Sequence, residues 1–405
     1  MLSRGRLAFI FVSFLAVLLV VAGTISARSN AEQEDGTDSP FKYLSVFMDV
    51  FSLVSKAYVD EPEGERLMAG AFEGTIDALD PFSLYIPEEY VETYRASREI
   101  GSRRSGLVLL KERGVAYVVA VEEGSPAASA GLEMGDILSE INGLRTRSTP
   151  LFSLIDLLAG EPGTRIEVER LRQGQKKQLG FELADYDPPS VVLEARRGVP
   201  VLAIPAFFEG TVASVEQSLS TVARGAQGLP GLQDTGKLVI DLRGVAGGDA
   251  ASAYRIAGLF VSGELGALLQ RGKALESFVG AAPKWSGEVA LLTDRGTQGA
   301  AEVFASILHQ ATEAKLVGSR TFGHSGRHVL VELSDGARLQ LTDAFYTGPD
   351  RSPINKSLEP DVRVRQWLVE AETEGTDAET SDPVLEAGLD ALLEPAAEEE
   401  REAAA

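Results

Sequence analysis

The chain has 405 residues, of which 44% are hydrophobic and 24% charged, with a formal net charge of -22 and no cysteine. This length exceeds what one hydrophobic core usually supports, so the sequence predicts two or three domains. The negative charge excludes nucleic-acid binding, because phosphate contacts need clustered Lys and Arg. The absence of cysteine excludes disulfides, thiolate metal sites and a Cys nucleophile.

The amino-terminal 28 residues resemble an export signal. Arg4 and Arg6 precede a continuous apolar run over residues 7–23. Its length lies between a long signal-peptide core and a short transmembrane helix, and the preceding charges keep the amino terminus cytoplasmic. Ile25 is bulky where a cleavage site needs a small residue, which favours an uncleaved anchor over a cleaved signal peptide. We therefore expect an exported protein on the periplasmic or extracytoplasmic face, anchored in the inner membrane by residues 7–23.

A polar linker over residues 29–40 precedes a helical segment over residues 41–98. In FKYLSVFMDVFSLVSKAYVD the apolar positions recur every three or four residues, which predicts one amphipathic helix. A second predicted helix, ERLMAGAFEGTIDAL, follows a Pro and Gly break. LDPFSLYIPEEY then predicts a turn and a helix start.

Residues 99–187 alternate like short strands with two helical pieces. GSPAASAGLEMGD predicts a helix that begins at a proline, ILSEING a strand running into an Asn-Gly turn, and TPLFSLIDLLAG a second helix before a terminal hairpin. This order resembles a PDZ domain of the kind found in bacterial proteases.

The PDZ resemblance implies that a polypeptide carboxyl terminus adds as a strand beside the second helix. The loop that holds its carboxylate is then Arg104, Ser105, Gly106 and Leu107. The usual loop is Gly-rich and apolar, so Arg104 and Ser105 depart from it. Two interpretations of Arg104 stay open: its charge attracts the carboxylate, or it is a solvated surface residue.

Residues 188–368 predict an α/β core with partly parallel strands. Apolar strand-like runs are followed by helical patterns, first KLVIDL before AASAYRIAGLF and then VALLT before AAEVFASIL. In such sheets ligand and catalytic groups gather at the carboxyl ends of the strands. The remaining residues, 369–405, form an acidic tail with one short predicted helix.

The flanks of the PDZ-like segment, in the same order along the chain, resemble the carboxyl-terminal processing peptidases, also called tail-specific proteases. The resemblance covers residues 41–393. It rests on six stretches: LDPFSLYIPEEY, VPVLAIPAFFEGTVASVEQSL, KLVIDLRGVAGGDAASAYRIAGLF, VALLTDRGTQGAAEVFASILHQA, VGSRTFGHSGRHVLVEL and DGARLQLTDAFYTGPDRSPINKSLEPDV. It implies a multidomain α/β (α+β) fold with a core of the crotonase-like or ClpP-like type.

The same resemblance indicates that the catalytic side chains are missing. The family is similar to Ser-Lys hydrolases, in which an unprotonated Lys removes the Ser proton. The nucleophile position, three residues after the turn glycine, is Gly299. The base position after Thr-Phe-Gly is His324, and the position of the Gln that orients the base is His328. Glycine has no atom that can attack a carbonyl.

Other hydroxyls are poor replacements. Thr297, paired with His324 as base, is the sharpest remaining enzyme interpretation, although on a helical start it is rotated roughly 200° from position 299. Ser306 lies roughly 10 Å further along the helix and is expected to pack inside. Ser325 is expected to point the other way from His324 if the segment is extended.

No metal or other cofactor is expected. Two histidines and a carboxylate can bind Zn²⁺, but HSGRH lies in a turn that enters a strand, and no carboxylate has diagnostic spacing. Gly247 and Gly248 end the stretch DLRGVAGG, where the family places its oxyanion-binding backbone. The alternative explanation for these glycines is a tight turn that needs positive φ.

The sequence favours an exported peptide-binding pseudopeptidase. Its expected partners are polypeptide carboxyl termini or unfolded segments and an active homologous peptidase, with the membrane touched only through the amino-terminal helix. Two alternatives stay open: an active serine-type endopeptidase with a rearranged site, and an envelope scaffold protein.

Overall fold

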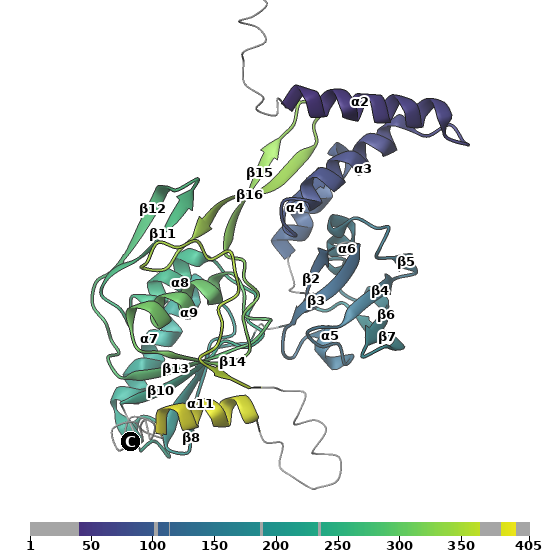
Figure 1. Ribbon diagram of the computed structural model, residues 1–405. Helices are drawn as coiled ribbons and strands as arrows, with labels where there is room; N and C mark the ends of the chain where they lie inside the picture. Colours follow the sequence, from purple (N-terminus) through teal and green to yellow (C-terminus); the bar gives the residue numbers. More distant parts are fainter. Residues whose placement is uncertain are drawn as a thin grey trace, which may run out of the picture. The chain divides into compact units, whose positions relative to one another are not determined.

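The computed structural model describes residues 40–100, 104–112, 114–186, 189–233, 236–364 and 382–393 (Figure 1). The chain divides into two compact units, Met1–Ala71 and Phe72–Ala405. The apolar run over residues 7–23 and the linker after it lie outside the described residues. Within the described ranges no helix has the length and apolar character needed to cross a membrane.

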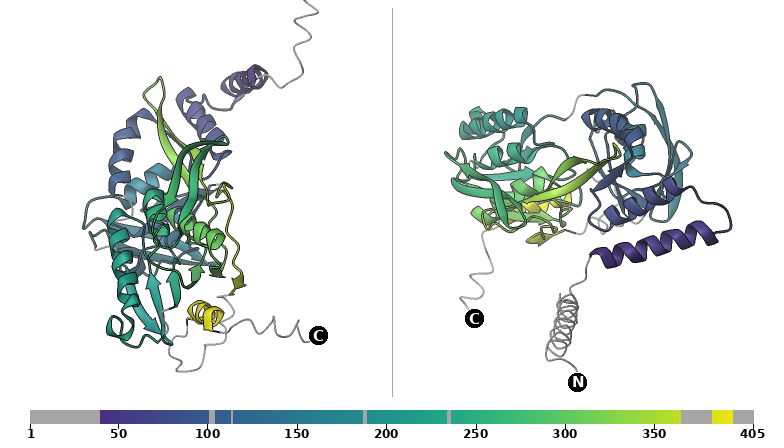
Figure 2. Two further views of the ribbon diagram at one scale, coloured as in Figure 1. Left: turned by 90° about the vertical axis from the view of Figure 1, so that its left-hand side faces the viewer. Right: turned by 90° about the horizontal axis from the view of Figure 1, so that it is seen from above.

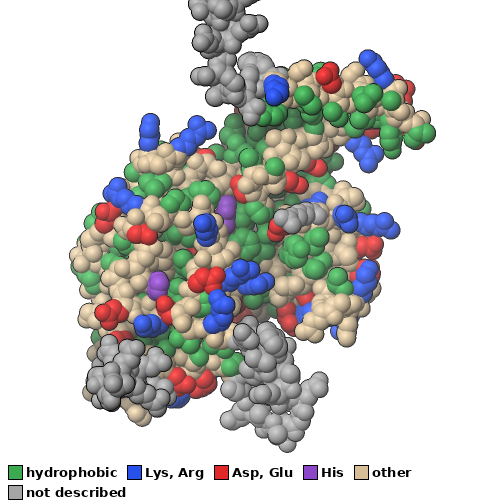
Figure 3. Space-filling model, in the orientation of Figure 1, with side chains coloured by type: hydrophobic (Ala, Val, Ile, Leu, Met, Phe, Trp, Pro, Cys, Tyr) green, Lys and Arg blue, Asp and Glu red, His purple; other side chains and the backbone are tan. Residues whose placement is uncertain are grey.

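The described part of the first unit is helical, as predicted. It holds α2 (Pro40–Ala57) and the beginning of α3 (Gly64–Asp77). Several large apolar side chains of α2 are more than half exposed, and green atoms follow this helix in Figure 3. They are Tyr43, Leu44, Val46, Met48, Val50 and Leu53.

The PDZ-like segment of the second unit is an antiparallel sheet in the order β2-β3-β4-β6-β7, with β5 paired to β4. Its strands are β2 (Leu107–Glu112), β3 (Val115–Val121), β4 (Ile137–Ile141), β5 (Leu144–Arg145), β6 (Arg165–Arg172) and β7 (Gln175–Glu182). Two helices accompany it, α5 (Pro126–Ser129) and α6 (Leu151–Leu158). Leu154 and Leu158 of α6 join the buried cluster of this sheet.

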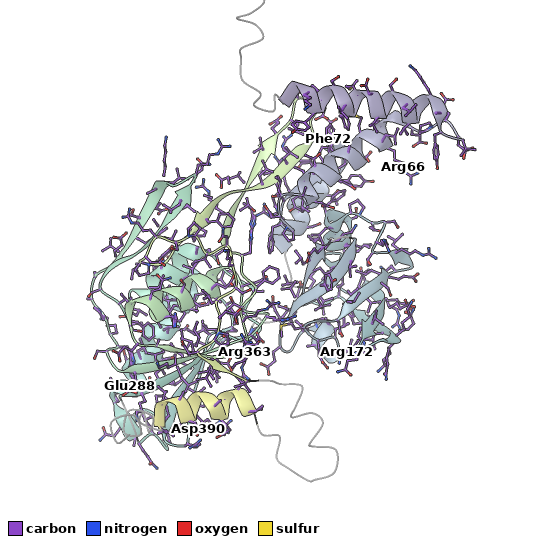
Figure 4. The ribbon with its side chains drawn as sticks, viewed as in Figure 1. Arg66, Phe72, Arg172, Glu288, Arg363 and Asp390 are labelled. Atoms are coloured by element: carbon purple, nitrogen blue, oxygen red, sulfur yellow. The ribbon has the colours of Figure 1, made fainter. Side chains whose placement is uncertain are left out.

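Local chemistry explains these elements. The Ser125 side chain accepts a hydrogen bond from the Ala128 N–H, and proline occupies the first turn of α5, as helix starts favour. Arg172 of β6 pairs with the buried carboxylate of Asp136 at 2.6 Å, and the label in Figure 4 marks this arginine. This ion pair fixes the turn before β4 against the end of β6.

The second sheet of this unit is the core sheet, in the order β17-β14-β13-β10-β9-β8. All neighbours are parallel except β8 and β9. The strands are β8 (Val192–Arg196), β9 (Val199–Ala203), β10 (Lys237–Asp241), β13 (Glu288–Thr293), β14 (Lys315–Gly318) and β17 (Val362–Arg363). The predicted α/β core with parallel strands is therefore confirmed.

Helices cover both faces of the core sheet (Figures 1 and 2). On one face lie α7 (Glu209–Ala223), α8 (Ala250–Ala257) and α9 (Ala300–Ala311), whose apolar side chains pack on the sheet. On the other lies α11 (Pro383–Leu393), through Val384, Leu389 and Leu392. The carboxyl-terminal helix is thus part of the core.

Ion pairs fasten α11 at both ends. Arg197 contacts Asp390, labelled in Figure 4, at 2.6 Å. Arg243 contacts Asp382 at 2.7 Å and Asp241 through the same guanidinium. Arg243 therefore connects the end of β10 to the start of α11.

A third sheet has the order β1-β16-β11-β12, with β15 paired to β16. The strands are β1 (Leu84–Ile86), β11 (Gly263–Gln270), β12 (Lys273–Gly280), β15 (Gly326–Glu332) and β16 (Arg338–Tyr346). β1 is followed by a 3-10 turn, η1 (Glu88–Tyr90), and by α4 (Val91–Ile100). LDPFSLYIPEEY therefore forms an edge strand as well as the predicted turn and helix start.

Candidate functional site

Two turns meet at the carboxyl ends of β10 and β13. We call residues 244–248 the oxyanion turn and residues 294–299 the elbow turn. The Gln298 N–H donates to the Val245 carbonyl at 3.0 Å, and the Gly244 N–H donates to Asp294 Oδ1 at 2.9 Å. The turns thus form one structure at the edge of the sheet where a parallel fold places its ligands.

Gly299 has the backbone conformation of a sharp elbow before a helix. Its φ is 59° and its ψ is -116°, and α9 begins at the next residue. A Cβ built on Gly299 would meet no heavy atom within 4 Å. The elbow turn therefore leaves open space at the place where a nucleophile would project, and the glycine supplies no side chain.

Glu302 holds the elbow turn against the segment after β14, which we call the base segment (residues 321–328). Its carboxylate is fully buried and accepts hydrogen bonds from the N–H groups of Gly299 at 3.2 Å, Gly323 at 2.6 Å and His324 at 3.0 Å. The Thr321 hydroxyl donates to it as well. Burial raises the pKa of Glu302, and these hydrogen bonds oppose the rise.

Thr297 is buried and serves the elbow turn. Its hydroxyl donates to the Leu242 carbonyl at 2.8 Å and accepts from the Asp294 N–H at 3.0 Å. Burial raises the pKa of Asp294, whose carboxylate accepts from three backbone N–H groups around the two turns. The position of Thr297 speaks against a relocated nucleophile, because its hydroxyl is enclosed and already donates.

Aromatic rings fill the base position. The His324 ring stacks on Phe82 with centroids 4.1 Å apart and on His328 with centroids 5.7 Å apart, and the edge of Phe345 lies 5.5 Å away. Burial lowers the pKa of His324 to about 4 and also lowers that of His328. Both imidazoles are therefore neutral at pH 7 and are held by stacking.

Ser306 and Ser325 make different contacts. Ser306 is buried and accepts a hydrogen bond from Gln310, as the packing prediction required. The Ser325 hydroxyl donates to the Gly299 carbonyl at 3.0 Å, whereas the neighbouring His324 ring stacks on Phe82. The Glu302 carboxylate binds backbone N–H groups of both the elbow turn and the base segment. This contact brings the Ser325 side chain to the elbow turn.

The oxyanion turn has backbone groups free to bind. The Phe207 N–H donates to the Gly247 carbonyl at 3.1 Å, but no described group accepts a hydrogen bond from the N–H of Gly247 or Gly248. Gly248 has a φ of +123°, and a Cβ there would lie 2.4 Å from the Phe207 carbonyl oxygen. A turn that requires a positive φ fits Gly248 but not Gly247, where a Cβ would meet only ordinary contacts. The N–H groups of both glycines are open to a carbonyl oxygen.

Phe208 forms an apolar wall beside this turn. Its side chain is 49% exposed. A Cβ built on Gly247 would lie 3.9 Å from the ring of Phe208 and 3.8 Å from Ala206. A polypeptide whose carbonyl accepts hydrogen bonds from the N–H groups of the oxyanion turn would therefore contact an aromatic ring.

The predicted PDZ loop lies before β2, whose outer edge has no partner among the described strands. Ser105 and Gly106 are buried, and the Ser105 hydroxyl accepts from the Leu107 N–H at 3.2 Å. Arg104 donates to the last carbonyls of α6, Ala159 at 3.2 Å and Gly160 at 2.7 Å. The Arg104 side chain is 18% exposed and also contacts Asp185 at 3.4 Å and Glu161 at 3.8 Å, so its charge beside the predicted groove is partly paired.

No group of three His, Asp or Glu side chains is placed to hold a metal ion within the ranges that the structure describes.

Asp294 and Glu302 organise the site, but the sequence analysis did not identify them. Glu302 follows the helix start at Gly299 by three residues, the spacing of a helix-capping carboxylate, and this signal could have found it.

Comparisons with known proteins agree with this architecture. Residues 198–364 match the model of Peptidase family S41, and residues 117–172 match a PDZ domain. The chain is 26% identical over 352 residues to the carboxy-terminal processing protease CtpB of Bacillus subtilis, covering 84% of this chain and 70% of that protein. It is 27% identical over 387 residues to the carboxy-terminal-processing protease of Bartonella bacilliformis, covering 91% of this chain and 84% of that protein.

A solved structure supports the fold. The photosystem II D1 C-terminal processing protease superposes with a TM-score of 0.63 at 23% identity, covering 78% of this chain and 92% of that one. The fold and the site thus define a multidomain protein with a PDZ domain and a peptidase-like α/β core. In sequence the chain is similar to C-terminal processing peptidases, and residues 198–364 carry the match to Peptidase family S41.

Proposed function

We propose that this protein binds polypeptide carboxyl termini without cleaving them. The observation that carries the proposal is the elbow turn, where Gly299 leaves open space and offers no nucleophile. The base position supports it, because burial lowers the pKa of His324 to about 4, which makes the imidazole a weak base, and its ring is stacked on Phe82 and His328. Losing the nucleophile of a serine protease costs on the order of a millionfold in turnover.

Peptide binding is supported by two surfaces that need no catalytic side chain. The open edge of β2 can pair with an extended chain beside α6, and Arg104 supplies positive charge at one end of that groove. In the core, the N–H groups of Gly247 and Gly248 are available to donate to the carbonyl of a bound peptide beside Phe208. Together they favour a protein that retains unfolded segments or carboxyl termini.

The first test is a peptide array probed with the full chain, using each peptide with a free and an amidated carboxyl terminus. We expect at least tenfold stronger retention of the free acids, and loss of that preference in Arg104→Gln. The matched control is Arg165→Gln, an exposed arginine of β6. Equal retention of acids and amides would contradict carboxylate recognition and favour an envelope scaffold.

The second test is labelling with a fluorophosphonate on the same sample. We expect no labelling of the wild type and no cleavage of casein after long incubation. Labelling that disappears in Thr297→Ala but persists in Ser306→Ala would establish the rival function, an active serine-type endopeptidase with a rearranged site.

We also propose that the chain is exported and anchored by residues 7–23, on the basis of Arg4, Arg6 and the apolar run that follows them. An active homologous peptidase is then a possible neighbour in the same compartment. Membrane fractionation of the full chain and of a chain beginning at Phe41 tests the anchor. Equal release of both into the soluble fraction would contradict it.

A further inference from the structure

Phe82 joins the base segment to the amino-terminal part of the second unit. Its ring covers His324, and its carbonyl accepts a hydrogen bond from Gln340 Nε2 at 2.8 Å. The same Gln340 accepts from the Tyr94 hydroxyl at 2.8 Å, and its backbone pairs with Leu84 of β1. The stacked rings therefore lie where residues 79–86 meet the strands that follow the site.

We propose that Phe82, His324 and His328 form an acid-sensitive latch, which holds residues 79–86 on the base segment at neutral pH and opens when the two imidazoles take up protons. The inference goes beyond the proposed function and does not depend on whether the protein cleaves peptides.

The geometry makes protonation unfavourable while the latch is closed. Two imidazolium rings would bring like charges to a centroid distance of 5.7 Å between partly buried rings. His328 Nε2 is buried and has no hydrogen-bond partner among the described residues, so a proton there would have no acceptor. Opening exposes both rings to water and removes these two costs.

The charged groups around the two histidine rings do not make protonation of the closed latch favourable. Asp80 favours the protonated form of both histidines, but its carboxylate already accepts from the N–H groups of Phe82 and Ser83 at 2.8 Å. Asp343 of β16 favours protonated His328 but forms an ion pair with Arg327 at 2.6 Å.

On the remaining elements, Arg98 of α4 opposes protonation of His328. Glu302 contacts the backbone N–H of His324. Desolvation is the largest contribution for both rings and lowers the pKa of each. A lowered pKa means that the stack contributes stability above the ordinary histidine pKa of roughly 6.5. That stability is lost as the pH falls towards about 4, the pKa of His324.

The helix α4, which follows the latch residues in the chain, contacts the PDZ-like segment. Beyond β1 the chain enters α4, where the Ser97 hydroxyl donates to Asp156 of α6 at 2.7 Å. The helix α6 borders the predicted peptide groove. Opening of the latch would therefore loosen an element that packs against a wall of the groove.

The test is hydrogen exchange on the full chain at pH 7 and pH 4, with rates corrected for the intrinsic pH dependence of exchange. We expect residues 79–86 to lose protection at least tenfold at pH 4 while β10 stays protected. The double variant His324→Phe and His328→Phe keeps the stack without a titratable ring and should retain protection. His309→Gln is the matched control, since His309 is the third histidine and pairs with Asp361 away from the stack.

Protection that falls equally in the double variant would overturn the latch, as would unchanged protection in the wild type or loss of protection throughout the core sheet. A second measurement stands if the double variant does not fold. In an NMR titration of the wild-type histidines we expect a midpoint of about 4 for His324. A midpoint near the ordinary value of roughly 6.5 would overturn the latch.

Discussion

The elbow turn and the base segment differ at the positions where the family resemblance implies catalytic side chains. At Gly299 the backbone keeps a φ of 59° and a ψ of -116°, with open space above it. At His324 the expected Lys position is occupied by a ring that stacks on Phe82 and His328. Position 299 therefore has open space, whereas position 324 is occupied by an aromatic ring in a stack.

The difference follows from what holds each region. Hydrogen bonds of three buried side chains hold the elbow turn in place. These side chains belong to Asp294, Thr297 and Glu302. Removing an exposed nucleophile leaves these contacts intact. A half-buried base needs partners of its own, so its replacement must come with a new packing arrangement. The backbone geometry of the elbow turn therefore does not depend on the side chain at position 299.

The largest expected effect is a gain of activity. The triple variant Gly299→Ser, His324→Lys and His328→Gln introduces the side chains that the family resemblance implies. The elbow turn has open space for a side chain at position 299. We expect hydrolysis of unfolded substrates to rise at least about 100-fold above the wild type, with fluorophosphonate labelling. The control replaces Gly299 by Ala with the other two changes. No gain over that control would show that the elbow is not competent.

Next in size is the loss of the buried carboxylate. Glu302→Gln places an amide N–H₂ against backbone donors that now share a carboxylate. We expect the free energy of unfolding to fall by about 2–4 kcal/mol in chemical denaturation. Glu313→Gln, on the exposed surface after α9, should change it little. Similar values for the two variants would break the claim that Glu302 holds both regions together.

A smaller loss is expected at Thr297. Thr297→Val removes the hydroxyl and leaves the Leu242 carbonyl and the Asp294 N–H without this partner, at a cost of about 1–3 kcal/mol in unfolding free energy. Thr297→Ser keeps the hydroxyl and should recover most of that loss. If the serine variant were no more stable than the valine variant, the hydrogen bonds would not be what fixes the elbow turn.

The smallest effect is expected at Arg243. Arg243→Lys cannot keep the paired contacts to both Asp241 and Asp382, so we expect a loss of about 1 kcal/mol and faster hydrogen exchange in α11. Arg224→Lys, an exposed arginine after α7, is the control. Unchanged exchange in α11 would show that its apolar face alone holds it.

The sequence predicted most elements that have strong periodicity. The strands β10 and β13 and the helices α6 and α9 lie where their apolar patterns predicted them. The hairpin of β11 and β12 was not predicted, because β12 is mostly exposed and carries no alternating apolar pattern. Positions 299, 324 and 328 came from the family resemblance, and their catalytic roles stay predictions.

The contacts that organise the site were beyond sequence reasoning for a physical reason. Glu302 and the base segment are about twenty residues apart, and no local pattern reports their hydrogen bonds. The same folding back brings the Ser325 hydroxyl to the Gly299 carbonyl. Contacts between segments that are distant in the sequence decide such positions.

The conformation of Gly299 also has a thermodynamic side. A residue with a Cβ at a φ of 59° and a ψ of -116° carries backbone strain on the order of 1–3 kcal/mol, which enzymes tolerate for the sake of a projecting nucleophile. Glycine adopts this conformation without that strain. At position 299 the absence of a Cβ therefore accounts both for an unstrained backbone and for the lack of a nucleophilic side chain.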